Sequence, residues 1–291
     1  MPVARTAADL HRLELPQGTI DLRVAGPADS AAPPVVFVHG LLVDSLLWTD
    51  VAEVLAERGI RSYAPNWPLG SHRVAMNPSA DLSPRGMAAL ITGLLDALAL
   101  TDVTLVGSDT GGALCQFAID ADHSRIGRLV LTNCDAFEVF PPREFAGLIT
   151  LGRYAALLKP LAAALSCTAI RHSRRGYELM FAGRPDAEIT RSWIQPILRD
   201  PAIRRDAAKL MSAMRPADLL EVSTRFGSFT KPVHIVWGDA DRCFPVSLAQ
   251  RLAAAFPDAT LTTVPGGRTF ISMDFPQRVA DAIAQDHPPA R

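Results

Sequence analysis

The sequence lacks an excess of charge of either sign. Among its 291 residues, 29 lysines and arginines face 30 aspartates and glutamates, so the formal net charge is −1. Proteins that are drawn to nucleic acid or to anionic lipid by their overall field carry a strong basic excess. We therefore expect a small-molecule substrate, with neither nucleic acid nor a membrane as partner. Both a monomer and a homodimer are compatible with this composition.

Long uninterrupted apolar runs are also missing. The N-terminal segment MPVARTAADLHRLELPQG has no continuous apolar stretch before its first charges, so it is not typical of a secretory signal. The most apolar later region, residues 145–170, is interrupted by Arg153, Lys159 and Pro160. This leaves no run able to cross a hydrocarbon core of about 30 Å. We expect no transmembrane helix and a cytoplasmic location.

The sequence has few cysteines and no ligand cluster. Its four cysteines lie far apart and form neither a C-x-x-C pair nor a Cys/His group, so we expect buried free thiols: Cys115, Cys134, Cys167 and Cys243. The glycine-rich stretch at residues 107–112 lacks the lysine of a phosphate-binding loop. We therefore expect no metal and no organic cofactor.

Short β-branched runs alternate with helical patterns between residues 12 and 133, which is typical of strand-helix-strand units and a mostly parallel sheet. Residues 87–98 have apolar side chains at helical spacing, with Pro84 near the expected first turn. We predict an outer strand at residues 19–25 and buried strands at 35–38, 60–64, 103–106 and 129–131.

The pattern changes after residue 136. Residues 137–226 read as successive helical stretches without a convincing strand, so we predict a helical cap inserted into a core of residues 1–136 and 227–291. Within the second part of the core we predict strands at 232–237 and 259–264, a helix at 247–256 and a closing helix. Residues 287–291 are predicted to be a loose tail.

The strongest local signal is the segment VTLVGSDTGGA at residues 103–113, in which a buried strand runs into small residues and then a helix. A Gly-x-Asp-x-Gly motif is weak by itself, but here it has the strand-turn-helix context that a nucleophile elbow needs. Glycine is needed at 107 and 111 because neighbouring backbone comes close to the strained turn. Asp109 occupies the nucleophile position.

This segment resembles the nucleophile elbow of α/β-hydrolases, and three further segments match that family in the same order. They are FVHGL at 37–41, VWGDAD at 236–241 and VPGGRTF at 264–270. The resemblance implies an α/β-hydrolase fold, with a mostly parallel central sheet, flanking helices and an inserted cap. It assigns Asp241 as the catalytic acid and the backbone N–H groups of Leu41 and Thr110 as an oxyanion hole.

An aspartate nucleophile is similar to that of the epoxide hydrolases and haloalkane dehalogenases, in which the carboxylate forms an ester that activated water cleaves. In the dehalogenases a tryptophan that holds the halide follows the nucleophile, whereas this chain has Thr110, which disfavours dehalogenation. Epoxide hydrolases use cap tyrosines to protonate the opening oxygen. Tyr154 and Tyr177 are candidates for this role, and the alternative is that both are packed amphipathic side chains.

The family's catalytic histidine is missing. Alignment on Pro265-Gly266 and on Phe270 places Thr269 where the histidine belongs, and no histidine lies between His234 and His287. A threonine hydroxyl cannot take a proton from water near neutral pH, whereas imidazole has a pKa of about 6.5. The usual second half of the hydrolytic reaction is therefore disabled.

Other side chains are candidates to replace or assist the lost base. His72 lies in a loop that passes close to the nucleophile in relatives of this fold, and the alternative is a loop histidine bonded to backbone or solvent. Asp135 follows the strand at 129–131 and is a second possible acid, or else the cap of the first cap helix. Arg268 is a candidate to pair with Asp241 or to bind an anionic substrate, and otherwise is a surface arginine.

Three functions compete. With a relocated base, Asp109 remains a nucleophile and the protein hydrolyses an epoxide, ester or similar small, largely apolar substrate. Alternatively, Asp109 is a general acid or base with a pKa raised by an apolar pocket, and catalyses a lyase, isomerase or cyclisation step without water. The third possibility is a catalytically silent ligand-binding protein.

Overall fold

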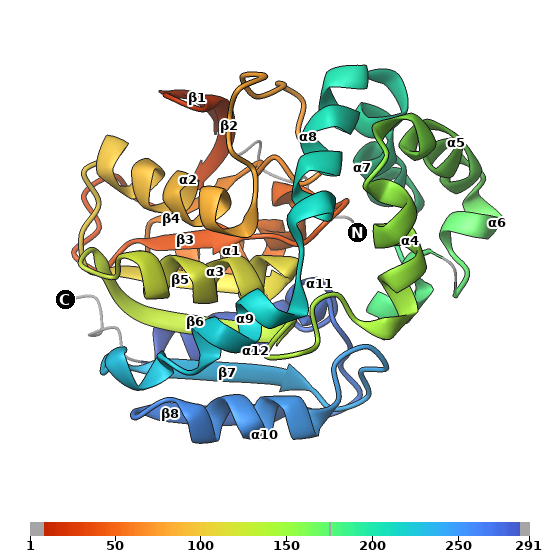
Figure 1. Cartoon of the computed structure of the whole chain (residues 1–291). Helices are drawn as coiled ribbons and strands as arrows, with labels where there is room; N and C mark the ends of the chain where they lie inside the picture. The colour runs from red at the N-terminus through yellow and green to blue at the C-terminus, as the bar shows by residue number, and fades with distance from the viewer. Residues whose placement is uncertain (1–8, 175, 286–291) are drawn as a thin grey trace.

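A sheet of eight strands forms the centre of the protein, whose computed structural model describes residues 9–174 and 176–285 (Figure 1). The spatial order is β1-β2-β4-β3-β5-β6-β7-β8. β2 pairs antiparallel with both β1 and β4, and every other pair is parallel. The strands are β1 (Asp9–Leu15), β2 (Gly18–Ala25), β3 (Val35–Val38), β4 (Ser62–Pro65), β5 (Val103–Asp109), β6 (Ile126–Cys134), β7 (Val233–Gly238) and β8 (Ala259–Val264).

The chain reverses its direction across the sheet after β4. It passes from β3 to β4 on one side, returns past β3 to β5, and then continues through β6, β7 and β8. Because crossovers between parallel strands are right-handed, α1 (Thr49–Glu57) lies on one face and α2 (Pro84–Ala97) and α3 (Thr110–Ala121) on the other. The carboxyl ends of β3 and β5 therefore border the crevice where ligands bind in open α/β sheets.

Helices cover both faces of the central strands. α1 packs against α12 (Pro276–Ala284), α2 packs against α3, and α10 (Val246–Ala255) packs against β7 and β8. α11 (Ile271–Asp274) precedes α12. Every residue of β3 and β5 is buried, as expected for parallel strands between two helical layers.

The chain between β6 and β7 is folded into helices. α4 to α8 lie beside the carboxyl edge of the sheet, whereas α9 packs against α3 (Figure 1). The helices are α4 (Ala146–Gly152), α5 (Ala155–Ser166), α6 (Thr168–Arg171), α7 (Ala187–Arg199), α8 (Pro201–Ala213) and α9 (Pro216–Ser223). We call residues 137–226 the inserted segment. Its standing as a separate cap domain stays a prediction.

Buried polar contacts join the inserted segment to the loops that follow β3 and β4. Trp193 Nε1 donates to Asp44 Oδ1 at 2.8 Å, and Ser71 Oγ donates to the Trp193 carbonyl at 2.8 Å. In α8, Asp206 Oδ2 accepts from the Met76 N–H at 2.8 Å. Since unpaired polar groups are costly in the interior, these bonds fix how the inserted segment sits on the sheet.

The predicted strands are all present, but one strand was missed. Residues 19–25 were predicted as an outer strand, whereas β1 pairs along the free side of β2 and is itself the edge. β1 has the sequence DLHRLEL, in which charged residues replace the β-branched ones that identified the other strands.

Three further predictions concern the cysteines, the absence of a membrane-spanning helix and the chain ends. Cys167 is exposed, so the expectation of a buried thiol was wrong there, while the other three cysteines are buried and free. None of the helices in the described part of the chain combines the length and apolarity that a bilayer span requires. The predicted tail at 287–291 and the first eight residues of the N-terminal segment lie outside the described residues.

Candidate active site

Asp109 sits at a strained turn between β5 and α3. Its φ of 55° and ψ of −134° are unusual for a residue with a side chain, as a nucleophile elbow requires. A Cβ on Gly111 would lie 2.3 Å from the Val38 carbonyl oxygen, and one on Gly40 would lie 2.0 Å from Asp109 Oδ2. The glycines are therefore needed because β3 and the elbow backbone are in contact.

Two backbone N–H groups hold the Asp109 carboxyl group. They belong to Leu41, just beyond β3, and to Thr110, the first residue of α3. The predicted oxyanion-hole residues thus meet at Asp109. The first N–H groups of a helix favour a negative charge nearby, so this arrangement also suits an ionised carboxylate.

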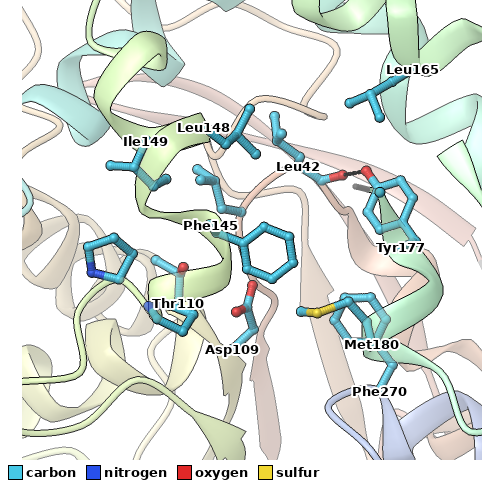
Figure 2. Close-up of a pocket in the computed structure, with 14 residues that line it drawn as sticks. Leu42, Asp109, Thr110, Phe145, Leu148, Ile149, Leu165, Tyr177, Met180 and Phe270 are labelled. Atoms are coloured by element: carbon cyan, nitrogen blue, oxygen red, sulfur yellow. Dashed lines mark hydrogen bonds between the residues drawn. The ribbon is translucent and has the colours of Figure 1, made fainter. Parts of the chain in front are cut away.

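The Asp109 carboxyl group points into an apolar cavity of about 600 Å³ of empty space (Figure 2). Asp109 and Tyr177 are its only ionisable lining residues within the described parts of the chain. The apolar lining comes mainly from the inserted segment: Pro141, Pro142, Phe145, Leu148, Ile149, Leu165 and Met180, joined by Leu41, Leu42 and Phe270. Such a cavity suits a small, largely apolar molecule.

The cavity raises the pKa of Asp109. Burial is the main cause, the N–H groups of Thr110 and Leu41 oppose it, and the nearby Asp241 charge adds to it, which brings the pKa to about 7. Without a cationic neighbour, a buried carboxyl group favours its neutral form. Near neutral pH, Asp109 is therefore poised between its acid and its base form.

Asp135 is a second buried carboxyl group beside the elbow. Its N–H lies 3.4 Å from the Asp109 carbonyl oxygen, and its own carbonyl accepts from Gln116 Nε2 at 2.8 Å. Neither oxygen of the Asp135 carboxyl group has a hydrogen-bond partner of good geometry among the described residues. The Thr110 side chain nevertheless lies close enough to favour the ionised form of Asp135. Burial and the Asp109 charge raise the Asp135 pKa well above its ordinary value.

The alternative prediction, that Asp135 caps the first helix of the inserted segment, was wrong. The N-cap of α4 is Phe145, and the short 3-10 turn before it is preceded by Pro142. Asp135 instead leads into an isolated bridge between Ala136 and Val139.

Asp241 and Thr269 are brought together as the alignment predicted. Thr269 Oγ1 donates to Asp241 Oδ2 at 2.8 Å, and Asp241 Oδ1 accepts from the N–H groups of Cys243 and Phe244 at 2.7 and 3.0 Å. Burial nevertheless raises the Asp241 pKa to about 6. The structure thus brings together the two residues that the sequence alignment assigned to the acid and histidine positions, and a threonine hydroxyl is the group that contacts the carboxylate.

His72 does not reach Asp109. It is buried, it is not among the cavity residues, and its Nε2 lies 3.3 Å from Asp206 Oδ2. Nδ1 accepts from the Gly70 N–H, so the hydrogen-bond network assigns the proton to Nε2. Burial lowers the His72 pKa more than Asp206 raises it, which keeps the ring neutral. The structure therefore supports the alternative of a histidine bonded to backbone and to a structural carboxylate.

The three remaining candidates lie in different settings. Tyr177 lines the cavity, but its hydroxyl donates to the Leu42 carbonyl (Figure 2). Tyr154 is 65% exposed and is absent from the cavity lining. Arg268 does not pair with Asp241, because its Nη1 donates to the carbonyls of Glu178 and Phe181 in the inserted segment.

Sequence reasoning overlooked Asn133. Its side chain accepts a hydrogen bond from the Gly238 N–H and donates one to the Gly238 carbonyl. The Asn133 side chain also favours the ionised form of Asp241 and so lowers the pKa of that group. The available signal was a polar residue at the carboxyl end of a buried strand, where sites of this architecture gather. The apolar cavity residues of the inserted segment carried no such signal, because in a sequence a leucine that lines a cavity cannot be distinguished from a leucine packed in the core.

A comparison with protein-family models matches residues 35–282 to the alpha/beta hydrolase family. The chain belongs to this family. The fold class predicted from the sequence is thereby confirmed, since sheet order, elbow and family match agree.

Known proteins place this α/β-hydrolase among hydrolytic enzymes. It is 27% identical over 274 residues to haloalkane dehalogenase 2 of Mycobacterium bovis, with 88% of each chain covered. Its fold matches an α/β-hydrolase-fold protein of Burkholderia ambifaria at a TM-score of 0.78 and 24% identity, covering 94% and 97% of the two chains. The epoxide hydrolase CorEH gives a TM-score of 0.78 at 16% identity, covering 95% and 97%. The chain is thus an α/β-hydrolase-fold enzyme with relatives among the haloalkane dehalogenases.

Proposed function

We propose that this enzyme uses Asp109 as a general acid and base on a small, largely apolar substrate, in a lyase, isomerase or cyclisation step that consumes no water. The observation that carries the proposal is the cavity lining. The described residues that line the cavity include one carboxyl group, Asp109, whose pKa is about 7, and they include no histidine.

The proton balance of such a step needs only Asp109. Its carboxylate takes a proton from carbon next to an activating group of the substrate. The resulting carboxylic acid, whose proton can exchange with solvent, then gives a proton back to a substrate carbon or to a departing group. A base works best when its pKa lies near the working pH, because both forms are then populated.

The surroundings of Asp109 support this role in two ways. Asp135 and Asp241 lie near it, and no cation among the described residues lines the cavity, so no described ion pair stabilises the ionised form of Asp109. The N–H groups of Leu41 and Thr110 fix the position of its carboxyl group. A positioned carboxyl with both forms accessible is what proton transfer requires.

A second candidate is hydrolysis through an Asp109 ester, which the Asp241–Thr269 hydrogen bond and the dehalogenase relative favour. The first half of that reaction needs only the carboxylate. The second half needs a base for water; His72 is bonded to Asp206, and no histidine among the described residues lines the cavity. An epoxide would also lack a free acid, since the Tyr177 hydroxyl is bonded to Leu42.

Two measurements separate these functions. The proposal expects wild-type protein in D₂O to exchange deuterium into members of a panel of small apolar ketones, and Asp109→Asn to lower the rate by at least about 10²-fold, the size of one general-base contribution. Exchange is read by mass spectrometry of the ketones. Thr110→Ser keeps the backbone N–H and serves as the folded control.

The second measurement is intact-protein mass spectrometry after incubation with haloalkanes, epoxides and activated esters. We expect no added mass on wild-type protein. A stable adduct on the peptide that contains Asp109, absent from Asp109→Asn, would instead establish the nucleophilic role. Thr269→His would then convert the trapped ester into turnover, because the new imidazole would stand beside Asp241.

A further inference from the structure

Several large hydrophobic side chains of the inserted segment are exposed. Six large hydrophobic side chains are exposed in the described residues, and four of them lie between positions 151 and 170. They are Leu151, Tyr154, Leu157 and Ile170, with exposed fractions of 45%, 65%, 40% and 40%. Proteins that stay in solution rarely gather such residues without a partner for them.

α5 lies at the centre of these exposed residues. The exposed residues of α5 are mostly apolar and include one cation, Lys159: Ala156, Leu157, Lys159, Pro160, Ala163, Ala164 and Ser166. The opposite side of α5 is also apolar, with Leu158 and Ala162 buried against the rest of the inserted segment. α5 and α6 lie on the far side of this segment from the sheet (Figure 1). A helix with exposed apolar residues and a lysine on its outer side is suited to an interface that is partly apolar and partly anionic.

The charges around these exposed residues are of one sign. No aspartate or glutamate occurs from residue 145 to 177, although the whole chain carries a net charge of only −1. Arg153, Lys159 and Arg174 are exposed in this stretch. None of the ion pairs found among the described residues involves any of the three.

We infer that the outer face of α4 to α6, which we call the docking face, binds the surface of an anionic lipid membrane. Exposed leucine and tyrosine side chains enter the headgroup region, and lysine and arginine beside them attract anionic lipids. The balanced net charge led to the expectation of no membrane partner. Our inference departs from that expectation, because a membrane contacts one face of a protein and responds to the charge of that face.

The inner sides of the same helices line the cavity. Leu148 and Ile149 of α4 and Leu165 of α5 face the space into which Asp109 points. An apolar substrate dissolved in the bilayer would therefore meet the inserted segment next to the cavity. This substrate route rests on the proposed function, whereas membrane docking itself does not depend on the chemistry of Asp109.

Vesicle sedimentation tests the docking face. We expect wild-type protein to bind vesicles of phosphatidylglycerol at least tenfold more tightly than vesicles of phosphatidylcholine, with the preference lost in high salt. Lys159→Gln should weaken binding about fivefold, the usual contribution of one surface cation. Tyr154→Glu/Leu157→Glu should weaken it more than tenfold. Leu220→Glu, at an exposed leucine of α9 outside the docking face, is the matched control and should bind as wild type.

Each other outcome counts against the inference. Equal binding to both vesicle types, or an equal loss in Leu220→Glu, would overturn it. So would a homodimer in sedimentation velocity that Leu157→Glu disperses while lipid binding is absent, because a second copy would then occupy the face. Asp109→Asn should bind vesicles as wild type, so the failure of the docking face and of the proposed chemistry are distinguishable.

Discussion

At the scale of single residues, the site is governed by two buried carboxyl groups, Asp109 and Asp241, that pair with no cation among the described residues. Asp109 and Asp241 have pKa values raised to about 7 and about 6 because burial penalises their charged forms. In the family triad an imidazole would relieve this charge. Here Thr269 donates one hydrogen bond to Asp241. Its hydroxyl carries no positive charge that could stabilise an ionised Asp109.

Asp109→Asn is expected to stabilise the protein at alkaline pH. The folded-state pKa of about 7 lies above the unfolded value of 3.8, so the folded state binds the proton more tightly. The stability that depends on this proton is complete below pH 3.8 and is lost as the pH rises to about 7. The variant should gain on the order of 2 kcal/mol at pH 8 and almost nothing at pH 4. Urea unfolding at both pH values measures it, and an equal change at both would contradict it.

Thr269→Val is expected to destabilise the protein, since it removes the hydroxyl that donates to Asp241 while keeping the shape of the side chain. The loss of a hydrogen bond to a charged group costs about 1.5–3 kcal/mol. The cost should be larger at pH 8 than at pH 5, because the Asp241 pKa is about 6 and the bond is strongest to the ionised form. Thr262→Val, on the exposed part of β8, is the control for urea unfolding. Equal costs in both variants would exclude a special role for this bond.

At the scale of elements, the site depends on the contact between the ends of β3 and β5. Glycine at 40 and 111 lets the β3 backbone touch the elbow, and this contact brings the Leu41 N–H to the Asp109 carboxyl group. α3 then begins at Thr110 and supplies the second N–H. The position of Asp109 is thus set by two strands and one helix together.

Gly40→Ala is expected to disrupt this contact. Its new Cβ would lie 2.0 Å from Asp109 Oδ2 and 2.6 Å from Asp109 Cβ, so the elbow must move. We expect a loss of about 1–3 kcal/mol, as for overpacking in a core, together with loss of the Asp109-dependent exchange. Gly93→Ala in α2 meets nothing within 4 Å and should instead gain about 0.5–1 kcal/mol. Thermal unfolding of both variants checks the opposite signs.

At the scale of the whole molecule, the inserted segment completes the cavity and is held by a few buried polar bonds. Asp206 of α8 accepts from the Met76 N–H and faces His72, both in the loop after β4. Burial alone would raise the Asp206 pKa, but the hydrogen bonds of His72, Met76 and Arg205 outweigh it and keep it below its ordinary value. The ionised Asp206 therefore ties the inserted segment to the sheet.

Asp206→Asn is expected to loosen this attachment. It removes a buried charge that accepts several hydrogen bonds, at a cost of about 3 kcal/mol. Amide hydrogen exchange should rise in residues 70–76 and in α8 before it rises in β5. Glu188→Gln, an exposed charge at the start of α7, should leave both stability and exchange unchanged. Uniform acceleration across the sheet would show that the bond stabilises the whole fold rather than the attachment.

The sequence by itself determined the sheet and the elbow, because their evidence is local. Buried parallel strands read as β-branched runs, and Gly107, Asp109 and Gly111 stand within five residues of one another. The alignment also found the Asp241–Thr269 pair, since both residues lie beside recognisable strand ends. β1 was not predicted, because this edge strand contains charged residues in place of a run of β-branched ones.

Only the tertiary structure decided which groups surround Asp109. His72 was a candidate by its loop, but folding placed it against Asp206, more than a hundred residues away in the sequence. The apolar cavity and the docking face both depend on which side of each inserted helix is covered. That cannot be read from residues 137–226 alone, because those helices are apolar on more than one side and only packing selects the buried one.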